Sequence, residues 1–559
     1  MPTRKLLERI GRNRGPAGGS TLSDVSDECD VLVIGSGSAA LAAALRCAGG
    51  GLRVTILEKT GRLGGTSAMS GAGTWIPANH RAAEAGIADS EAEALDYIRA
   101  ASPSGWQETE DELWAAFVRN APVMLRFLEQ RTPLRFALTD EPDTMAEKPG
   151  GKKRGRMLSP LPLRKSLAGR YARRIRRSTL PHLYTYQEVY DGDLYHRPVS
   201  ATLRFAHRLV WRLLTGSRAQ GSALVTGLLA GCLGNNCRVE LNARAVALCS
   251  EDGSIVGATV ERNGNRRTFR ARRGVVVATG GFEWDRDLLG KHFPGALDRL
   301  GSPRANEGDG QKMLAEAGAQ LARMDQANVY PTMPTIYEGK LHGIPLIFQA
   351  EKHAILVDRT GNRFASEYDF NIGEAIDRRD ANGNPVHLPV WIVADRRFVR
   401  RSPTLRWYAR KQKGWLIGAP TLASLAEKIG VPAAPLETTV ARFNSFCANG
   451  RDLDFHRGES VWEAFKAGGA GAALGTIEQA PFYAMSLNRS ILGTKGGART
   501  NANGQVLRAD GSVIAGLYAA GLAMANPIGT RAVGPGTTIG PNLTWGYICG
   551  SSLLSDNRG

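Results

Sequence analysis

The sequence predicts an α/β fold in which two separated parts of the chain build one parallel sheet and an α+β domain is inserted between them. Three observations lead to this prediction. A short apolar strand at residues 30–34 runs through a glycine turn into a helix. The apolar strand in residues 274–285 also ends in glycines, and a third strand–glycine–helix sequence occupies residues 510–554. With 559 residues, the chain is longer than one hydrophobic core usually serves, so we expect two or more domains.

The composition is that of an ordinary soluble protein. Hydrophobic residues make up 43% of the chain and charged residues 22%. No window holds the ~18 uninterrupted apolar residues that a membrane-spanning helix needs. Seven dispersed cysteines without a Cys-x-x-Cys pair suit a reducing compartment, and nine histidines show no metal-binding spacing. We therefore expect a cytoplasmic protein without a metal site.

Basic residues give the chain a formal net charge of +18 and are concentrated in two runs. Residues 148–186 contain no acidic residue, and residues 396–413 form the second run. The excess could be a solvated face, a surface that attracts an anionic membrane or substrate, or a nucleic-acid site. No recognition motif accompanies it, so we expect no nucleic-acid partner. Residues 204–214 (RFAHRLVWRLL) could form a basic amphipathic helix on a membrane surface, or a core helix.

The first strand–turn–helix unit carries a dinucleotide-binding fingerprint. In DVLVIGSGSAAL, Gly35, Gly37 and Ala40 form GxGxxA, and the next strand ends in Glu58. Gly35 permits the tight turn, Gly37 lets a pyrophosphate approach the backbone, and the helix N-terminus faces the phosphates. Glu58 is placed to accept hydrogen bonds from ribose hydroxyls. Strand, turn, helix and terminal acid together predict a Rossmann-type domain.

A second glycine turn indicates which dinucleotide is bound. After Glu58 the sequence continues KTGRLGGTSAMSG, where Gly64 and Gly65 precede hydroxyl side chains that can donate hydrogen bonds to a cofactor. This addition resembles the FAD-binding flavoproteins related to fumarate reductase and to 3-ketosteroid dehydrogenases. The resemblance runs from about residue 28 to the end of the chain. It implies non-covalent FAD, because no histidine stands at the usual attachment segment before GGTSAMSG.

Further segments match the FAD site of this family. Residues 274–285 end an apolar strand in Thr-Gly-Gly, and Asp309 opens a predicted helix. The strand expected over residues 238–248 runs beside the adenosine in this family, which implies contacts from Ala245 or Val246. The glycine-rich loop 526–542 would bring backbone N–H groups to the flavin ring. The residues expected to bind FAD are Gly35, Gly37, Ser38, Ala39, Ala40, Glu58, Lys59, Gly64, Gly65, Thr66, Ser67, Ser70, Gly71, Ala245, Val246, Thr279, Gly280, Gly281, Asp309, Gly521, Gly536, Thr537, Thr538 and Ile539.

The C-terminal loop resembles that of the 3-ketosteroid Δ1-dehydrogenases. Gly-Pro-Gly is kept at residues 534–536 and is followed by Thr-Ile-Gly-Pro. Two active-site tyrosines of that family are absent. Ala532 stands at the position of one, and Thr144 and Met145 stand at the position of the other.

The resemblance implies desaturation next to a carbonyl, in which a base removes a proton and a hydride leaves to flavin N5. The N–H of Gly536, with help from Arg531, could hold the developing enolate. A tyrosine would be the base. Tyr330 stands where fumarate reductases have their substrate histidine, and Tyr368 lies near the position of their arginine. A tyrosine needs a nearby cation or N–H donors to act near neutral pH, and Arg531 is a candidate cation.

The leading expectation is a desaturase for a hydrophobic, 3-ketosteroid-like cyclic ketone that passes electrons to an external acceptor. The same residues could serve an enone or enoate reductase of the fumarate-reductase type. A flavin-binding protein that has lost catalysis is a third interpretation. The sequence does not predict the oligomeric state.

The domain boundaries follow from these segments. We expect a flexible segment (1–27) and a first part of the FAD domain (28–284) that includes a basic arm (135–215). An α+β catalytic, or capping, domain (285–485) then leads into the second part of the FAD domain (486–559).

Overall fold

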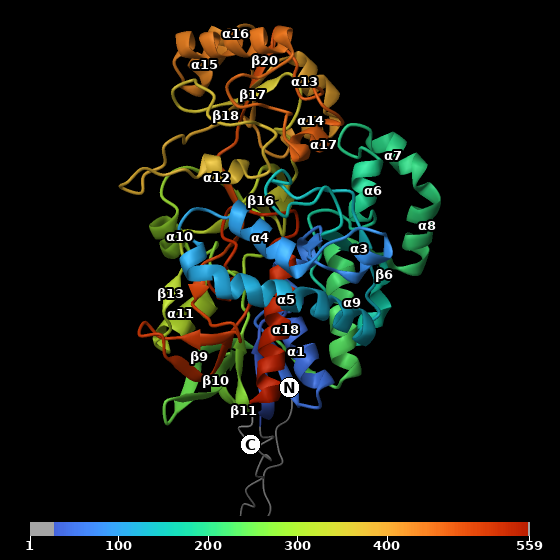
Figure 1. Ribbon diagram of the computed structural model, residues 1–559, viewed down its shortest axis with the longest axis vertical. Coiled ribbons are helices and arrows are strands. Elements are labelled where there is room, and N and C mark those ends of the chain that lie inside the picture. Colours follow the sequence, from blue (N-terminus) through green and yellow to red (C-terminus); the bar gives the residue numbers. More distant parts are fainter. Residues whose placement is uncertain (1–26, 557–559) are drawn as a thin grey trace, which may run out of the picture.

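The computed structural model describes residues 27–556, so the predicted flexible N-terminal segment lies outside the described residues but for its last position. Its centre is an eight-stranded sheet in which five neighbouring strands are parallel, in the order β24-β11-β1-β2-β8 (Figure 1). Strand β24 comes from the C-terminal part of the chain, which confirms the predicted α/β class. The strands of this row and the edge strand β23 are β1 (Glu28–Ile34), β2 (Val54–Glu58), β8 (Arg238–Leu241), β11 (Asn265–Val277), β24 (Val513–Ala519) and β23 (Gln505–Leu507).

Two helices from opposite ends of the sequence cover one another beside this sheet. Helix α1 (Ser38–Gly49) consists mainly of alanine and leucine and is buried along most of its length. Helix α18 (Ile539–Ser555) packs against it closely, since a β-carbon at Gly546 would collide with the carbonyl oxygen of Ala39. The neighbouring helices are α9 (Gln220–Gly234) and α5 (Gln107–Arg131).

The strand predicted over residues 238–248 is two strands. β8 ends at Leu241, and β9 (Arg244–Glu251) begins a meander with β10 (Ser254–Arg262) and β11. The break falls at Asn242, whose φ of +55° is a conformation that asparagine tolerates better than most residues. The turn moves Ala245 off the parallel row and onto the meander.

The inserted domain has its own antiparallel sheet, in the order β17-β18-β20-β19, at the top of Figure 1. Two separate hydrophobic clusters pack on it, so this part has a core of its own. Its strands are β17 (Ala354–Val357), β18 (Trp391–Ala394), β19 (Leu416–Ala419) and β20 (Phe482–Ser486). Its helices are α12 (Ile372–Ile376), α13 (Arg396–Arg401), α14 (Pro403–Ala409), α15 (Leu422–Ile429), α16 (Ala433–Asn449) and α17 (Val461–Ala467).

Small sheets join the two domains around the predicted boundary at 485/486. β21 (Arg489–Thr494) follows that boundary, yet it pairs with β12 (Leu297–Leu300) and β14 (Ala327–Val329) of the inserted segment. The chain therefore returns to the large sheet only with β23 and β24. The other connecting elements are α10 (Arg286–His292), α11 (Asp309–Glu316), β13 (Leu321–Ala322), β15 (Thr332–Tyr337), β16 (Lys340–Pro345), β22 (Gly497–Ala498) and the 3-10 turn η2 (Gly521–Ala523).

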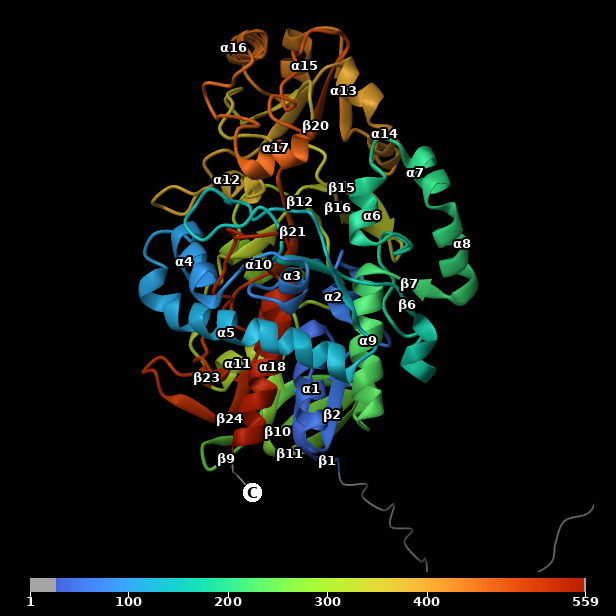
Figure 2. The same cartoon turned by 45° about the vertical axis from the view of Figure 1, so that its right-hand side comes forward.

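The basic arm lies along one side of the molecule, with α7 and α8 at its outer edge (Figure 2). Its elements are β4 (Phe136–Leu138), β5 (Met157–Pro160), β6 (Leu163–Arg164), η1 (Lys165–Tyr171), α6 (Tyr186–Asp191), α7 (Pro198–Arg204) and α8 (Ala206–Thr215). Before and after it stand α2 (Gly65–Met69), β3 (Thr74–Trp75), α3 (His80–Glu84), α4 (Glu91–Ala101) and β7 (Ser217–Arg218). Across residues 27–556, no helix combines the length and the apolar character needed to cross a bilayer.

Candidate active site

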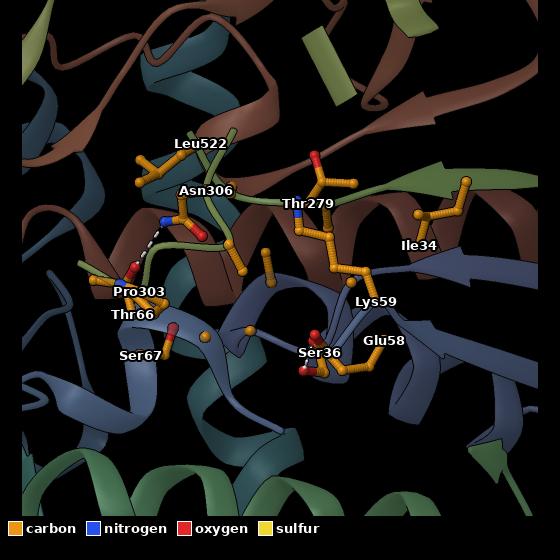
Figure 3. A pocket seen from close by; sticks show the side chains of 18 of the residues that line it. Ile34, Ser36, Glu58, Lys59, Thr66, Ser67, Thr279, Pro303, Asn306 and Leu522 are labelled. Carbon is orange, nitrogen blue, oxygen red and sulfur yellow. Dashed lines mark hydrogen bonds between the residues drawn. The ribbon is translucent and has the colours of Figure 1, made fainter. Parts of the chain in front are cut away.

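A cavity opens where the carboxyl ends of β1, β2 and β11 meet the first turn of α1 (Figure 3). In an α/β sheet this edge is the usual place for a ligand. Its lining residues are Ile34, Gly35, Ser36, Gly37, Ser38, Ala39, Leu57, Glu58, Lys59, Gly65, Thr66, Ser67, Arg176, Ala243, Ala245, Ala278, Thr279, Gly280, Pro303, Ala305, Asn306, Glu307, Asp309, Gly521, Leu522 and Asn542.

The turn before α1 is held in a shape that only glycine fits. Gly35 has φ of +115°, and a β-carbon there would collide with the carbonyl oxygen of Ala278 on the neighbouring strand. Gly37 differs, because a β-carbon there would lie 3.6 Å from Ser67 Oγ, an ordinary contact. The space in front of Gly37 is therefore not required by the protein's own packing, and a pyrophosphate can approach the backbone there.

Glu58 ends β2 with its side chain 8% exposed. Its carboxylate accepts hydrogen bonds from Ser36 Oγ at 2.5 Å and from the Thr60 backbone N–H at 2.8 Å. Figure 3 shows Ser36 and Glu58 side by side in the cavity. The Thr60 hydroxyl donates a third hydrogen bond, at 2.9 Å. A carboxylate has about four acceptor sites, so Glu58 keeps about one for a ribose hydroxyl.

Charged side chains pair at the rim of the cavity. Lys59 Nζ lies 2.9 Å from carboxylate oxygens of both Glu307 and Asp309, and Arg244 bonds Asp309 at 2.7 Å. Burial opposes ionisation of Asp309, but Arg244 and Lys59 hold its pKa below the usual value. Lys59 and Asp309 are thus engaged with one another as well as facing the cavity.

Two buried polar atoms at the cavity indicate that a polar ligand fits there. Thr279 Oγ1 and Asn542 Oδ1 are buried and lack a hydrogen-bond partner within the described chain. An unpaired buried polar atom costs free energy, so each favours a bound polar group. Together with the glycine turn, the helix N-terminus and Glu58, these atoms fit a dinucleotide.

The structure gathers many of the residues expected to bind FAD, but not all of them. Lining residues that sequence reasoning missed include Ser36, which is the middle residue of GxG, and Asn306, whose amide donates to Thr66 Oγ1 at 3.1 Å. Arg176 reaches the cavity from the basic arm, a contact that no local motif signals. The expected residues outside the lining are Ala40, Gly64, Ser70, Gly71, Val246, Gly281, Gly536, Thr537, Thr538 and Ile539.

A second group of side chains, the tyrosine–glutamate cluster, consists of Glu141, Tyr186, Tyr190 and Tyr330. Glu141 is 2% exposed and accepts a hydrogen bond from the Tyr186 hydroxyl at 3.4 Å. Its other oxygen, Oε2, is buried without a hydrogen-bond partner within the described chain. Burial raises the pKa of Glu141 to about 7, and the nearby Tyr190 hydroxyl and the charge of Lys466 oppose this shift.

The tyrosines of this cluster come from two parts of the chain. Tyr186 and Tyr190 stand four residues apart on α6, with ring centroids 5.5 Å apart. Tyr330 follows β14, and its ring meets Phe370 edge-on at 6.2 Å. Burial, and then the charge of Glu141, raise the pKa of Tyr330 well above its usual value.

The cluster touches the same glycine backbone that supports the C-terminal loop. A β-carbon at Gly71 would lie 3.1 Å from the Tyr186 ring. A β-carbon at Gly536 would lie 2.6 Å from the backbone of Gly73. Gly71 and Gly536 do not line the cofactor cavity, but this chain of contacts connects both to the tyrosines.

The other predicted catalytic residues have different surroundings. Arg531 donates two hydrogen bonds to Glu374, at 2.8 and 2.9 Å, so its guanidinium is paired with a carboxylate and not with a tyrosine. Tyr368 is 4% exposed and lies in a small apolar cluster, under the guanidinium of Arg457 at 4.8 Å. Burial raises the pKa of Tyr368 to about 12, although Arg457 opposes the shift. Tyr368 therefore packs in the inserted domain, against Arg457 and this apolar cluster.

The positions of the two absent family tyrosines meet in the structure. Thr144 Oγ1 donates to the carbonyl oxygen of Ala532 at 2.9 Å. Asn371 holds the same residue from the other side, accepting from its N–H at 2.8 Å and donating to its carbonyl at 3.1 Å. The structure thus brings Thr144, Asn371 and Ala532 together through these three hydrogen bonds.

Sequence reasoning missed Glu141, Tyr186 and Tyr190. The signal in the sequence was weak. Thr185 and Glu188 form a capping box that starts a helix, and Tyr186 and Tyr190 share one face of that helix because they are four residues apart. Nothing local shows that this face meets Glu141, which lies 45 residues earlier.

Comparison with known proteins supports the assignment of the cavity to FAD. The chain belongs to the family described as FAD binding domain, whose model matches residues 30–539. It is 37% identical over 549 residues to 4-oxocyclohexanecarboxylate 2-dehydrogenase of Sinomonas cyclohexanicum, covering 95% of this chain and 93% of the relative. It is 33% identical over 558 residues to 3-oxosteroid 1-dehydrogenase of Mycobacterium tuberculosis H37Rv, covering 93% of this chain and 97% of the relative.

A solved structure shows the same likeness over the whole chain. The crystal structure of 3-ketosteroid delta1-dehydrogenase from Sterolibacterium denitrificans in complex with 1,4-androstadiene-3,17-dione superposes with a TM-score of 0.85 at 28% identity. The match covers 95% of this chain and all of that one. The expected family, the FAD cofactor and the enzyme class are confirmed. The protein is an FAD-dependent oxidoreductase acting on CH–CH bonds, a dehydrogenase of the 3-ketosteroid and oxocyclohexanecarboxylate type.

Proposed function

We propose that this enzyme introduces a carbon–carbon double bond next to the carbonyl of a hydrophobic cyclic ketone, 3-ketosteroid-like in its reacting ring. The observation that carries the proposal is the tyrosine–glutamate cluster in contact with Gly71, on the segment that also contributes to the FAD cavity. Two of the relatives act, by their names, on a cyclic ketone and on an oxosteroid. The reaction removes a proton from the carbon beside the carbonyl and a hydride from the next carbon.

FAD, when bound non-covalently in the cavity, supplies the two-electron acceptor for that hydride, and an external acceptor completes turnover. The chain supplies the proton chemistry. In our proposal Tyr330 takes the proton from the ketone's α-carbon through its phenolic oxygen. The backbone N–H of Gly536 binds the ketone oxygen and stabilises the negative charge that develops there.

Tyr330 cannot act as a base by ionising beforehand, because its pKa is raised. A neutral phenol can accept the substrate proton only if it gives up its own. Glu141 is suited to receive that proton, since its pKa of about 7 leaves a substantial ionised fraction near neutral pH. The Tyr186 hydroxyl, which bonds Glu141 at 3.4 Å, would carry the proton between them. This path replaces the Arg531 cation considered from the sequence.

The test is an anaerobic titration of the purified flavoprotein, followed by the visible flavin band. The panel contains a saturated 3-ketosteroid, a plain cyclohexanone and 4-oxocyclohexanecarboxylate. We expect at least one of them to bleach the oxidised band, and an artificial acceptor to restore it. The Tyr330→Phe variant should bind FAD but bleach at least about 100-fold more slowly. No bleaching by any saturated ketone, together with reoxidation of reduced enzyme by an enone, would contradict the proposal.

A further inference from the structure

Helices α7 and α8 expose an unusual amount of apolar surface. Soluble proteins rarely leave large apolar side chains together at the surface unless they bind something. The side chains here are between 53% and 78% exposed. They are Val199, Leu203, Val210, Trp211, Leu213 and Leu214, and we call them the amphipathic face of α7 and α8.

This exposure is fixed by contacts on the opposite side of α8. Arg212 is 7% exposed and donates two hydrogen bonds to Glu188 of α6, at 2.5 and 2.9 Å. Leu209, three residues before it, is buried. Because Leu209 and Arg212 hold one side of α8 against the protein, Val210, Trp211 and Leu214 must face outward. Figures 1 and 2 both show α7 and α8 at the outer edge of the molecule.

Exposed cations surround the amphipathic face. Strand β6 pairs Arg164 with Ser217, which follows α8, so the basic run 148–186 continues directly from the end of this helix. The charges of Arg218, Arg177 and Arg62, added to burial, lower the pKa of Lys165, which shows that the cations crowd one another. The exposed arginines of the arm and of the two helices are Arg135, Arg154, Arg164, Arg170, Arg173, Arg174, Arg177, Arg197, Arg204 and Arg208.

We propose that the amphipathic face of α7 and α8 docks on an anionic lipid bilayer, with its apolar side chains among the acyl chains and the surrounding arginines on the headgroups. An apolar face flanked by cations is the pattern of a helix that lies in a membrane interface. Trp211 is of the side-chain type that settles at headgroup depth. A run without acidic residues complements a negative lipid surface. A second copy of this chain would carry the same positive charge, and its approach would be opposed.

The experiment is co-sedimentation of the full-length flavoprotein with vesicles. One set contains phosphatidylglycerol mixed with phosphatidylcholine, and the other contains phosphatidylcholine alone. We expect binding to the anionic vesicles that is at least about tenfold tighter and that weakens in high salt. No binding, or equal binding to both sets, would overturn the proposal.

A matched pair of variants locates the binding surface. Replacing Trp211→Ser and Leu214→Ser together should weaken binding at least about tenfold, since burying one large apolar side chain is worth roughly that factor. Leu453→Ser changes a leucine that is 60% exposed in the inserted domain, and should bind as the wild type does. Flavin content and thermal unfolding check that each variant folds.

A measurement of molecular mass in solution tests the alternative that a second copy of this chain, and not a membrane, covers the amphipathic face. If the wild type is a dimer that the double variant converts to monomers, and vesicles are not bound, the face is a contact between copies and the proposal fails. Because vesicle binding is measured without any substrate, this test is independent of the proposed desaturation.

Discussion

The FAD cavity and the tyrosine–glutamate cluster both adjoin the segment 65–73, but they are built from different kinds of groups. The cavity takes its shape from glycine turns, strand ends and a helix N-terminus. The cluster is made of ionisable side chains that are expensive to bury, including a glutamate with an unpaired oxygen. We therefore expect substitutions of the cavity glycines to change FAD binding and folding by steric collision. Substitutions in the cluster should instead change proton transfer and leave the fold in place.

The largest expected effect tests the backbone half of this comparison. Gly35→Ala puts a β-carbon into Ala278 at a positive φ, so we expect loss of both flavin and stability. A β-carbon at Gly37 does not collide with the protein, so Gly37→Ala should fold normally. Its affinity for FAD should nevertheless fall at least about tenfold. Flavin absorbance and thermal unfolding measure the two effects.

The control for these two variants is Gly234→Ala at the end of α9, where a β-carbon meets nothing within 4 Å. It should keep wild-type flavin content. Full flavin retention by Gly37→Ala would show that the cofactor does not approach this turn.

The next largest effect tests the side-chain half. Tyr330→Phe removes the proposed proton acceptor and keeps the ring that meets Phe370. We expect kcat to fall about 10²- to 10⁴-fold with flavin content unchanged. Tyr368→Phe is the matched control, because it removes another buried tyrosine hydroxyl, from a ring that packs under Arg457. An equal loss of activity in both variants would rule out the distinction between them.

A smaller and pH-dependent effect is expected for Glu141. Wild-type activity should rise as pH increases through about 7, where the Glu141 carboxyl ionises. Glu141→Gln should lose this inflection and lower kcat about 10- to 100-fold. A pH–rate profile of the two proteins, at saturating ketone, provides the measurement.

Stability should change with pH in the opposite sense. The folded pKa of Glu141 lies above its ordinary value of 4.5, so the folded state holds this proton more tightly than the unfolded state. Its contribution to stability is fully present below about 4.5 and is lost as pH rises through about 7. Glu141→Gln should flatten this part of the Tm profile. An unchanged profile would argue against a buried, protonated Glu141.

The smallest effect sharpens the role of Arg531. Its ion pair with Glu374 is about one-third exposed on both sides (33% and 35%), and such pairs contribute less than about 1 kcal/mol. Glu374→Gln and Arg531→Gln should therefore change kcat by only a few-fold and to a similar extent. If Arg531→Gln abolished desaturation while Glu374→Gln did not, Arg531 would be the catalytic cation after all.

The cofactor, the fold class and the glycine turns at the cavity could be predicted from the sequence alone. These features are local: the conformation of Gly35, the start of α1 and the acid at the end of β2 depend on residues a few positions apart. The break at Asn242 was also encoded locally, by a residue that tolerates positive φ, but the apolar residues on both sides concealed it.

The tyrosine–glutamate cluster and the ion pair of Arg531 could be seen only in the folded structure. Glu141, Tyr186 and Tyr330 lie near one another although they span 189 positions of the sequence. Arg531 pairs with Glu374, which lies 157 positions earlier in the sequence. Whether a carboxyl is buried, and which charges surround it, depends on the packing of distant elements, which sets its desolvation and its pKa. Backbone shape can be inferred from neighbours in sequence, whereas proton affinity depends on neighbours in space.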